Sequence, residues 1–333
     1  MEHGVTFASS EDDAFNLNPP LAGAIKDAQV RGNPLILRSV LGYVAASRAS
    51  KGGPQAFMDA TKFIVSNMLR SVTKKLEIEM LYGQIGYAKV DAGVTTTVQI
   101  QIAEWAPGIW AGAEGMPIEI RDSTGATSRG EVTVTSVDFE NKRITISSAL
   151  TLSANDVIWH KGAYGNEFPG IHKILSTTTG TMFNINVATY SLFRGNVYSA
   201  SSAALSFNKV IKAVARAVEK GLESKVLALV NPRGWSDMLS DQAALRQYDQ
   251  SYSPDGLKQG SKSLTFFSQN GEIEIEPSIY VKEGFAYILS LEDWYRVGST
   301  DVTFKRPGQG DEFFRDLENA AGYEMRLYTD QAV

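Results

Sequence analysis

Apolar residues recur every three or four positions in one long segment, and this spacing predicts the longest helix of the chain. The segment spans residues 55–82. Its apolar positions are Phe57, Ala60, Ile64, Met68, Val72, Leu76 and Met80. Pro54 stands at the first turn, where a missing N–H is tolerated, and Gly83 ends the pattern. At about 1.5 Å per residue the helix extends roughly 42 Å, long enough to organise the elements beside it.

After Gly83 the period of the apolar positions changes from 3.6 to 2, which predicts β-strands. The first strand carries the alternating set Val94, Thr96, Val98, Ile100 and Ile102. Further strands are expected at residues 116–120, 131–139, 143–147 and 156–160, with turns at 122–125 and 140–142. Strands at such short intervals predict a small antiparallel barrel or sandwich inserted into a larger fold.

The region from residue 200 to 300 mixes helical and strand patterns, which predicts an α/β lobe. Ser206 is placed to cap a helix that ends at Gly221, and Asn231-Pro232 opens a second helix after an apolar strand at 226–230. Four more strands are expected, at residues 264–267, 272–276, 279–281 and 286–289, with a turn at 269–271.

The two ends of the chain are predicted to be extended. Residues 1–20 are polar, contain the acidic run 11–13 and end in Pro19-Pro20, as expected for an arm that lies on a partner. Residues 33–50 carry apolar side chains and stop at the Gly-Gly-Pro breaker 52–54, which predicts a projecting hairpin or loop. Residues 323–328 alternate apolar and polar side chains and predict a strand that returns to the first lobe.

Composition places the chain among globular proteins and removes several classes of function. Of its 333 residues 43% are hydrophobic and 21% are charged, enough for two or three lobes with real cores. The absence of cysteine excludes disulfides, thiolate nucleophiles and zinc–thiolate sites. We expect no membrane partner, because the sequence contains no apolar run of roughly 18 residues and no signal-peptide start. A net charge of −5 argues against a dedicated nucleic-acid binder. It suits the inner surface of a container that packaged nucleic acid contacts without binding tightly.

No motif predicts a catalytic, cofactor-binding or metal-binding residue. The three histidines, His3, His160 and His172, lack a metal-chelating spacing and are expected to be surface or hydrogen-bonded residues. Phosphate-binding, dinucleotide-binding and nucleophile-elbow glycine motifs are missing as well. We therefore expect a protein that is not an enzyme and needs no cofactor.

Three groups of residues keep a second interpretation open. Glu272, Glu274 and Glu276 share one strand face, which fits a solvated surface better than a glycosidase or cation site. The pair Trp105 and Trp110 is expected in a core or subunit contact, with a sugar pocket as the alternative. Lys74 and Lys75 are expected in solvent near the helix end, with nucleic-acid contact as the alternative.

Five short stretches, taken with the order of the elements, resemble a known family. The stretches are AASRA at 45–49, AFMDAT at 56–61, LEIEMLYGQ at 76–84, VNPRGW at 230–235 and GFAY at 284–287. They resemble the major capsid proteins of tailed bacteriophages, which have the Hong Kong 97-type fold. The likeness covers most of the chain.

The resemblance implies an α+β fold divided into regions with distinct roles. The ranges are an N-terminal arm at 1–30, a projecting loop at 31–54, the spine helix and peripheral domain at 55–93, a β-rich insertion at 94–175, peripheral strands at 176–200 and 301–333, and an α/β axial domain at 201–300. It also implies a capsid subunit that self-assembles through hexamers and pentamers into an icosahedral shell around the phage genome.

Partners and location follow from the same resemblance. It implies self-contacts, scaffolding, portal and decoration proteins, loosely held double-stranded DNA, assembly in the host cytoplasm and a final place in the virion. One alternative is an encapsulin-type nanocompartment subunit, against which the β-rich insertion argues. The other, less favoured alternative is a carbohydrate-active enzyme built on the tryptophan pair and the three glutamates.

Overall fold

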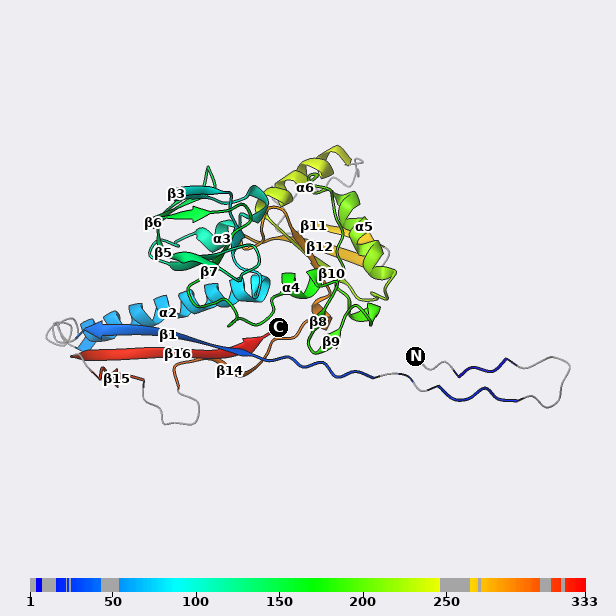
Figure 1. The fold of residues 1–333 in the computed structure, drawn as a ribbon, viewed down its shortest axis with the longest axis horizontal. Helices are drawn as coiled ribbons and strands as arrows, with labels where there is room; N and C mark the ends of the chain where they lie inside the picture. The colour runs from blue at the N-terminus through cyan, green and yellow to red at the C-terminus, as the bar shows by residue number, and fades with distance from the viewer. Residues whose placement is uncertain are drawn as a thin grey trace, which may run out of the picture.

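The computed structural model describes residues 4–7, 16–21, 23, 25–42, 54–245, 264–268, 271–305, 313–318 and 321–333. Within these ranges the chain is an α+β protein, as predicted, with four sheets and one long helix. Figure 1 shows three bodies beside each other: a long helix lying on a narrow sheet, a compact β-domain, and an α/β lobe.

Several sequence predictions concern residues outside the described ranges. They are His3, the acidic run 11–13, residues 43–53 of the projecting segment with the stretch 45–49, and residues 269–270 of the predicted turn.

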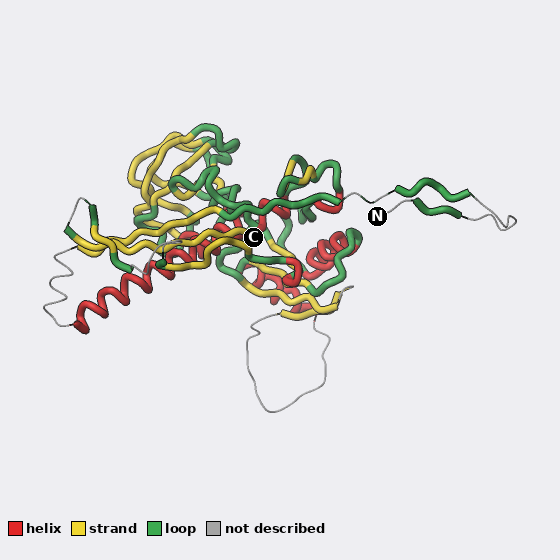
Figure 2. The backbone as a smooth tube through the Cα atoms, turned by 90° about the horizontal axis from the view of Figure 1, so that it is seen from below, coloured by secondary structure: helices red, strands yellow, loops and turns green. Residues whose placement is uncertain are grey.

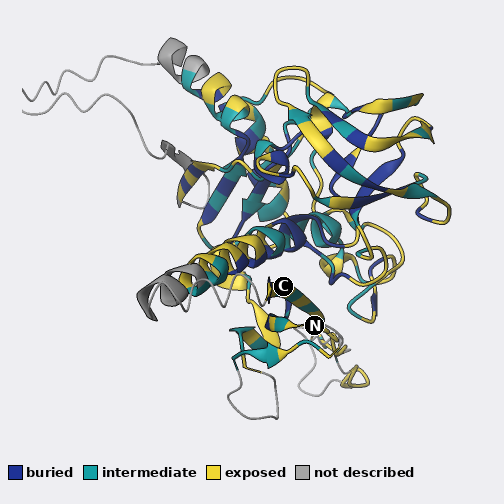
Figure 3. Cartoon of the chain, turned by 90° about the vertical axis from the view of Figure 1, so that its left-hand side faces the viewer, coloured by how far each residue is buried: buried dark blue, intermediate teal, exposed yellow. Residues whose placement is uncertain are grey.

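The predicted long helix is confirmed as α2, Pro54–Tyr82, and it begins at the proline and stops before Gly83 as expected. Its C-terminal half is the more buried half, a gradient visible in Figure 3. Gly83 is required at the stop, since a Cβ there would lie 2.1 Å from the carbonyl oxygen of Phe168. The amide of Gly170 donates to the carbonyl of Gly83 at 3.0 Å, so the chain crosses the helix end at close range.

The helix lies on a narrow sheet that joins the two ends of the chain. Strand β1 (Asn33–Gly42) pairs antiparallel along its whole length with β16 (Gly322–Ala332). Strands β14 (Val297–Thr303) and β15 (Arg315–Asp316) pair with the other edge of β16. The predicted C-terminal strand is thus confirmed. The described part of the projecting segment is a strand whose partner is distant in sequence, not a local hairpin.

One face of this sheet packs on α2, because its apolar residues alternate with exposed ones. The shared core contains Met68, Val72 and Leu76 from the helix and Met325 and Leu327 from β16. The opposite face leaves Ile36 and Val40 exposed.

The predicted β-rich insertion is a curled antiparallel sheet of six strands in the order β2-β7-β4-β5-β6-β3. The strands are β2 (Ala88–Lys89), β3 (Gly93–Gln99), β4 (Pro117–Arg121), β5 (Ser128–Asp138), β6 (Arg143–Leu152) and β7 (Val157–His160). Backbone bonds from Asp91 to Gln99 and from Gln101 to Lys89, each 3.0 Å, join the two ends. This closure confirms a barrel.

Strand β3, which corresponds to the alternating set from Val94 to Ile102, is shorter than that pattern predicted. Val98 and Ile100 are buried as expected, but Val94 and Ile102 are 74% and 64% exposed. Ile102 already begins the short helix η1 (Ile102–Glu104), which is followed by α3 (Pro107–Trp110).

The α/β lobe contains the predicted helices α5 (Phe207–Val218) and α6 (Pro232–Leu245) on a four-stranded sheet. The strand order is β11-β12-β10-β13, and β10 and β12 run parallel. The strands are β10 (Val226–Val230), β11 (Leu264–Ser268), β12 (Gly271–Pro277) and β13 (Ala286–Leu289). The strand expected at 279–281 is wrong: this stretch is a turn, in which the amide of Val281 bonds to Ser278. A short helix, η3 (Leu291–Asp293), follows β13.

The connection between the barrel and the α/β lobe differs from the expected peripheral strands. It contains α4 (Ile171–Ser176), a separate hairpin of β8 (Thr181–Met182) and β9 (Ile185–Asn186), and η2 (Ser191–Phe193). The hairpin pairs with itself and does not extend the β1–β16 sheet.

Candidate functional site

The tryptophan pair lies in the core of the protein. Trp105 and Trp110 stack with ring centroids 6.2 Å apart, and both are at most 2% exposed. They belong to the same core as Ile100 at the end of the first predicted barrel strand and Ile109 of α3. The expectation of a core contact is confirmed, and buried indoles leave no surface on which a sugar ring could stack.

The three glutamates of β12 lie elsewhere, on the solvent side of the α/β lobe. Glu272, Glu274 and Glu276 are exposed, while Ile273 and Ile275 between them are fully buried. The expectation of a solvated strand face is confirmed. The structure does not bring these glutamates together with the tryptophans, so the two features do not form one carbohydrate site.

Lys74 and Lys75 connect the C-terminal third of α2 to the barrel and to the loop after α3. The Lys74 ammonium donates to the carbonyl of Ala111 at 2.5 Å, and Lys75 Nζ lies 3.0 Å from His160 Nε2. Burial, followed by the charge of Lys75, lowers the pKa of His160, so its neutral ring accepts this bond. Both lysines lie in the last third of the helix as expected, but they are only half-exposed and each contacts the rest of the protein, so the expectation of free side chains in solvent is wrong.

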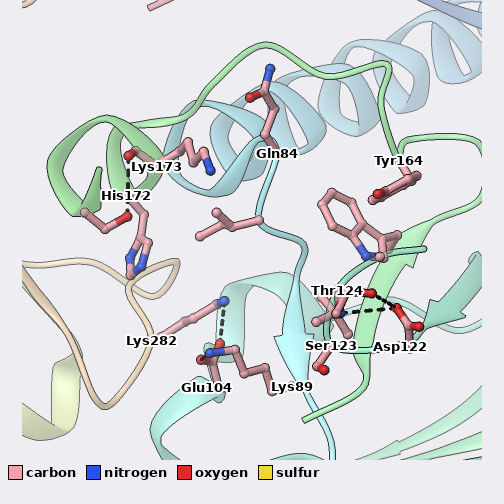
Figure 4. A pocket seen from close by; sticks show the side chains of 15 residues that line it. Gln84, Lys89, Glu104, Asp122, Ser123, Thr124, Tyr164, His172, Lys173 and Lys282 are labelled. Atoms are coloured by element: carbon pink, nitrogen blue, oxygen red, sulfur yellow. Dashed lines mark hydrogen bonds and ion pairs between the residues drawn. The ribbon is translucent and has the colours of Figure 1, made fainter. Parts of the chain in front are cut away.

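A polar cluster joins the three bodies where they meet, and we call it the junction cluster. It consists of Tyr82 at the end of α2, Lys89 of β2, Glu104 of η1, His172 of α4, Lys282 from the loop after β12, and Tyr287 of β13. Figure 4 shows Lys282 pointing at Glu104, with His172 next to Lys282 and the 122–125 turn on the opposite side of the view.

Lys282 is the central residue of the junction cluster. Its ammonium lies 2.7 Å from Glu104 Oε2, 3.4 Å from the carbonyl of Gly86 and 4.3 Å from the centroid of the Tyr82 ring. Lys89 approaches the other oxygen of Glu104 at 3.6 Å. A buried cation is tolerated only with such partners, which here include both a carboxylate and an aromatic face. The contacts bind the α/β lobe to the barrel and to the helix end.

The remaining groups of the cluster are also paired. His172 Nδ1 and the Tyr287 hydroxyl are 2.8 Å apart, and the Tyr82 hydroxyl donates to the carbonyl of Tyr280 at 2.8 Å. Burial, followed by the charge of Lys282, lowers the pKa of His172 to about 4, so this ring is neutral at physiological pH. Burial raises the pKa of both tyrosines.

The electrostatics of Glu104 follow from the same contacts. Burial alone would raise its pKa, but the charge and hydrogen bond of Lys282, with the charge of Lys89, outweigh burial and lower it. The cluster therefore contains an ionised carboxylate beside a buried lysine. Its polar groups are paired within the protein, so the cluster connects the three bodies through buried polar contacts.

The cluster borders a cavity of about 370 Å³ between the barrel and α4. Its wall on the barrel side is the turn 122–125, where Asp122 accepts bonds from Thr124. Among the described residues, no group of three histidine, aspartate or glutamate side chains is placed to hold a metal ion.

A second buried pair lies at the end of α2, where Gly83 and Gly170 meet. Glu79 accepts a bond from the amide of Phe168 at 3.4 Å, and Glu167 accepts one from the amide of Gln84 at 3.0 Å. Burial, followed by the charge of Glu167, raises the pKa of Glu79 to about 8, and burial raises that of Glu167 to about 7. Two buried acids without a cation resist simultaneous ionisation.

Sequence reasoning did not find either buried cluster. Lys282 and Glu104 stand among ordinary polar neighbours, and only the fold brings them within 2.7 Å. Glu79 stands next to Met80 of the predicted apolar stripe, and a single acid in a helix is usually exposed to solvent.

The extended arm is the most exposed part of the described chain. Figure 2 shows it leaving the body as two strands of chain that lie side by side. These are residues 4–7 and 16–21, joined by bonds from Asn18 to Thr6 and Val5. Near the body, the amide of Gln29 donates to the carbonyl of Phe183, and Lys26 lies over the Tyr190 ring.

The arm presents apolar side chains to solvent. Phe7, Leu17 and Ile25 are 90%, 77% and 89% exposed. An ordered extended segment must recover its conformational entropy by burying such side chains against another surface. The arm therefore has the properties of a binding segment.

Comparisons with protein-family models and with curated protein sequences found no match to this chain. No helix in the described ranges has the length and apolarity that crossing a lipid bilayer requires.

Proposed function

We propose that this chain is a major capsid protein of the tailed-bacteriophage type, with a Hong Kong 97-type fold. In this role it assembles through hexamers and pentamers into a closed icosahedral shell around the genome. It contributes no catalysis, and it acts through contacts with copies of itself.

The order and shape of the elements support the proposal. An extended arm leads to the long strand β1, the 29-residue helix α2 follows, and the chain returns through β16 to pair with β1. The barrel and the α/β lobe are inserted between these two strands. A subunit of this shape combines a rigid body with extensions that reach a neighbour.

The exposed arm is the observation that carries the proposal. Phe7, Leu17, Leu21 and Ile25 are 61–90% exposed, and exposing such large apolar side chains to water is costly. Buried on a neighbouring copy, many such weak contacts give a shell of high collective stability.

Sedimentation velocity of the purified chain tests this function. We expect large particles for the wild type and small species for Leu17→Ser/Leu21→Ser/Ile25→Ser, since the arm loses its apolar side chains. The matched control Val94→Ser/Ile102→Ser/Leu291→Ser removes three equally exposed apolar residues from the body and should assemble normally. A wild type that sediments as a monomer at every concentration contradicts the proposal.

The content of the particles separates a capsid from a nanocompartment. Nuclease-protected DNA inside particles made in infected cells supports the capsid, and an enclosed enzyme supports the encapsulin-type alternative.

A further inference from the structure

The two faces of the β10–β12 sheet in the α/β lobe differ in what covers them. On one face Ile273 and Ile275 pack under Phe207, Val210 and Val214 of α5. Because successive strand residues point to opposite sides, the glutamates of β12 lie on the other face.

That second face is covered only in part. Tyr287 and Leu289 of β13 belong to the large core beneath the barrel. Glu272, Glu274 and Glu276 are exposed, and among the described residues none of these carboxylates forms an ion pair or a hydrogen bond. We call this unpartnered surface the glutamate face.

The outer side of α5 carries the opposite charge. Lys209, Lys212 and Arg216 recur at spacings of three and four along one side of α5, and Lys220 follows in the turn directly after the helix. We call these four residues the basic stripe. Lys212, Arg216 and Lys220 are exposed. Lys209 and Arg216 donate to the carbonyls of Ala204 and Val197, which leaves their charges uncompensated.

The two charged surfaces lie on opposite sides of one two-layer lobe. Helix α5 covers the Ile273 side of the sheet, so the basic stripe faces away from the sheet on that side, and the glutamate face looks the other way. The two surfaces cannot meet within one subunit. They can meet between subunits, where each copy offers a basic surface to one neighbour and an acidic surface to the other.

We propose that the glutamate face of one subunit docks on the basic stripe of the next, in a head-to-tail contact between α/β lobes. The inference rests on the proposed function and specifies which surfaces join neighbouring subunits. A heterologous contact of this kind closes into a ring when the rotation permits and does not stop at a two-fold dimer. Charge complementarity of this type sets register and speeds encounter.

Charge reversal tests the contact. We expect Glu272→Lys/Glu274→Lys/Glu276→Lys, in which both surfaces are basic, to reduce assembly by about ten-fold or more because like charges then face each other. We expect the same loss for Lys212→Glu/Arg216→Glu/Lys220→Glu, in which both surfaces are acidic. A control with the same change of charge, Asp91→Lys/Glu114→Lys/Glu140→Lys, should assemble as the wild type does, since these exposed residues lie outside the lobe.

Mixing the two reversed variants gives the decisive result. In a mixture every contact can pair a basic surface with an acidic one if the two variants alternate, so assembly should return. Strict alternation requires rings with an even number of subunits, so six-membered rings form and five-membered rings do not. In a single chain that carries all six substitutions, the glutamate face is basic and the basic stripe is acidic. Each contact then again pairs opposite charges, so this variant should also assemble.

The outcomes separate this contact from the proposed function. If the wild type assembles and either triple variant assembles equally well, or if the mixture stays unassembled while circular dichroism shows both variants folded, the contact is wrong and the capsid function stands. If the wild type remains monomeric, both fail.

Discussion

The junction of the three bodies and the N-terminal arm differ in which side chains they bury and which they expose. At the junction, charged groups such as Lys282 and Glu104 are buried and paired with each other. In the arm, apolar groups such as Phe7 and Ile25 are almost fully exposed and are not covered by any of the described residues. The junction buries its charged groups within one chain, whereas the arm leaves its apolar groups exposed.

This difference divides the effects of mutation into two kinds. Substitutions at the junction should lower the free energy of unfolding of a single subunit. Substitutions in the arm should leave that quantity unchanged and act on association. Four predictions test this division.

The largest loss of stability is expected for Lys282→Ala. The substitution leaves the buried Glu104 without its closest cation, and breaking a buried pair costs about 3–5 kcal/mol. The measurement is urea unfolding. Arg296→Ala is the control, because its exposed pair with Asp301 should contribute less than about 1 kcal/mol. Equal losses for both variants would show that burial of the junction pair is unimportant.

The second prediction compares the stability cost of substitutions on the two faces of the β1–β16 sheet. Leu327→Ala empties a fully buried site against α2 and should cost about 2–5 kcal/mol. Ile36→Ala lies on the outer face and should change stability by less than about 0.5 kcal/mol. Thermal unfolding of both variants measures the contrast, and similar costs would mean that the outer face is buried in the isolated subunit.

A pH-dependent effect is expected at the buried acids. The pKa of Glu79 in the folded protein is raised to about 8. The stability that its protonated form contributes is therefore fully present below the pKa of the unfolded chain, near 4.5, and is lost as the pH rises through 8. Glu79→Gln keeps the neutral shape and should be more stable than the wild type at pH 9 by more than about 2 kcal/mol, because each unit of the raised pKa corresponds to about 1.4 kcal/mol.

At pH 5 the two proteins should be nearly equal. Denaturant unfolding at both pH values measures the difference. The exposed Glu140→Gln variant is the control and should show no such pH dependence. A Glu79→Gln variant that is less stable than the wild type at pH 9 would mean that Glu79 is ionised and paired in the folded protein.

The smallest effect on stability is expected in the arm. Leu17→Ser/Leu21→Ser/Ile25→Ser should change the free energy of unfolding of a subunit by less than about 0.5 kcal/mol, since these side chains contact little of the body. The same variant should fail to assemble. A marked loss of monomer stability would show that the arm folds back onto its own chain.

Local patterns predicted most of the elements, because helix and strand periods reflect burial directly. The helix α2, the barrel strands, α5, β10 and α6 followed from apolar spacing and from Pro54, Gly83 and Asn231-Pro232. The stretch 279–281 was predicted as a strand because it is apolar, but it forms a turn. Within it Val281 is buried, Ile279 is 50% exposed, and the carbonyl of Ile279 accepts a bond from the amide of Gly108 in α3.

Contacts between distant parts of the sequence were beyond such reasoning. The pairing of Asn33 with Gln331 joins residues from the two ends of the chain, and no local pattern specifies it. Lys74, Lys75 and Lys282 look like solvent-facing lysines in the sequence, yet each bonds to a group that only the fold brings near. The exposed glutamates of β12 were predictable because their alternation with buried isoleucines is local.

Negative-stain electron microscopy of the purified wild-type protein tests the central claim most directly. The proposed function predicts closed shells, or rings and sheets built from five- and six-membered units. Isolated subunits at every protein concentration, without rings or shells, would contradict it.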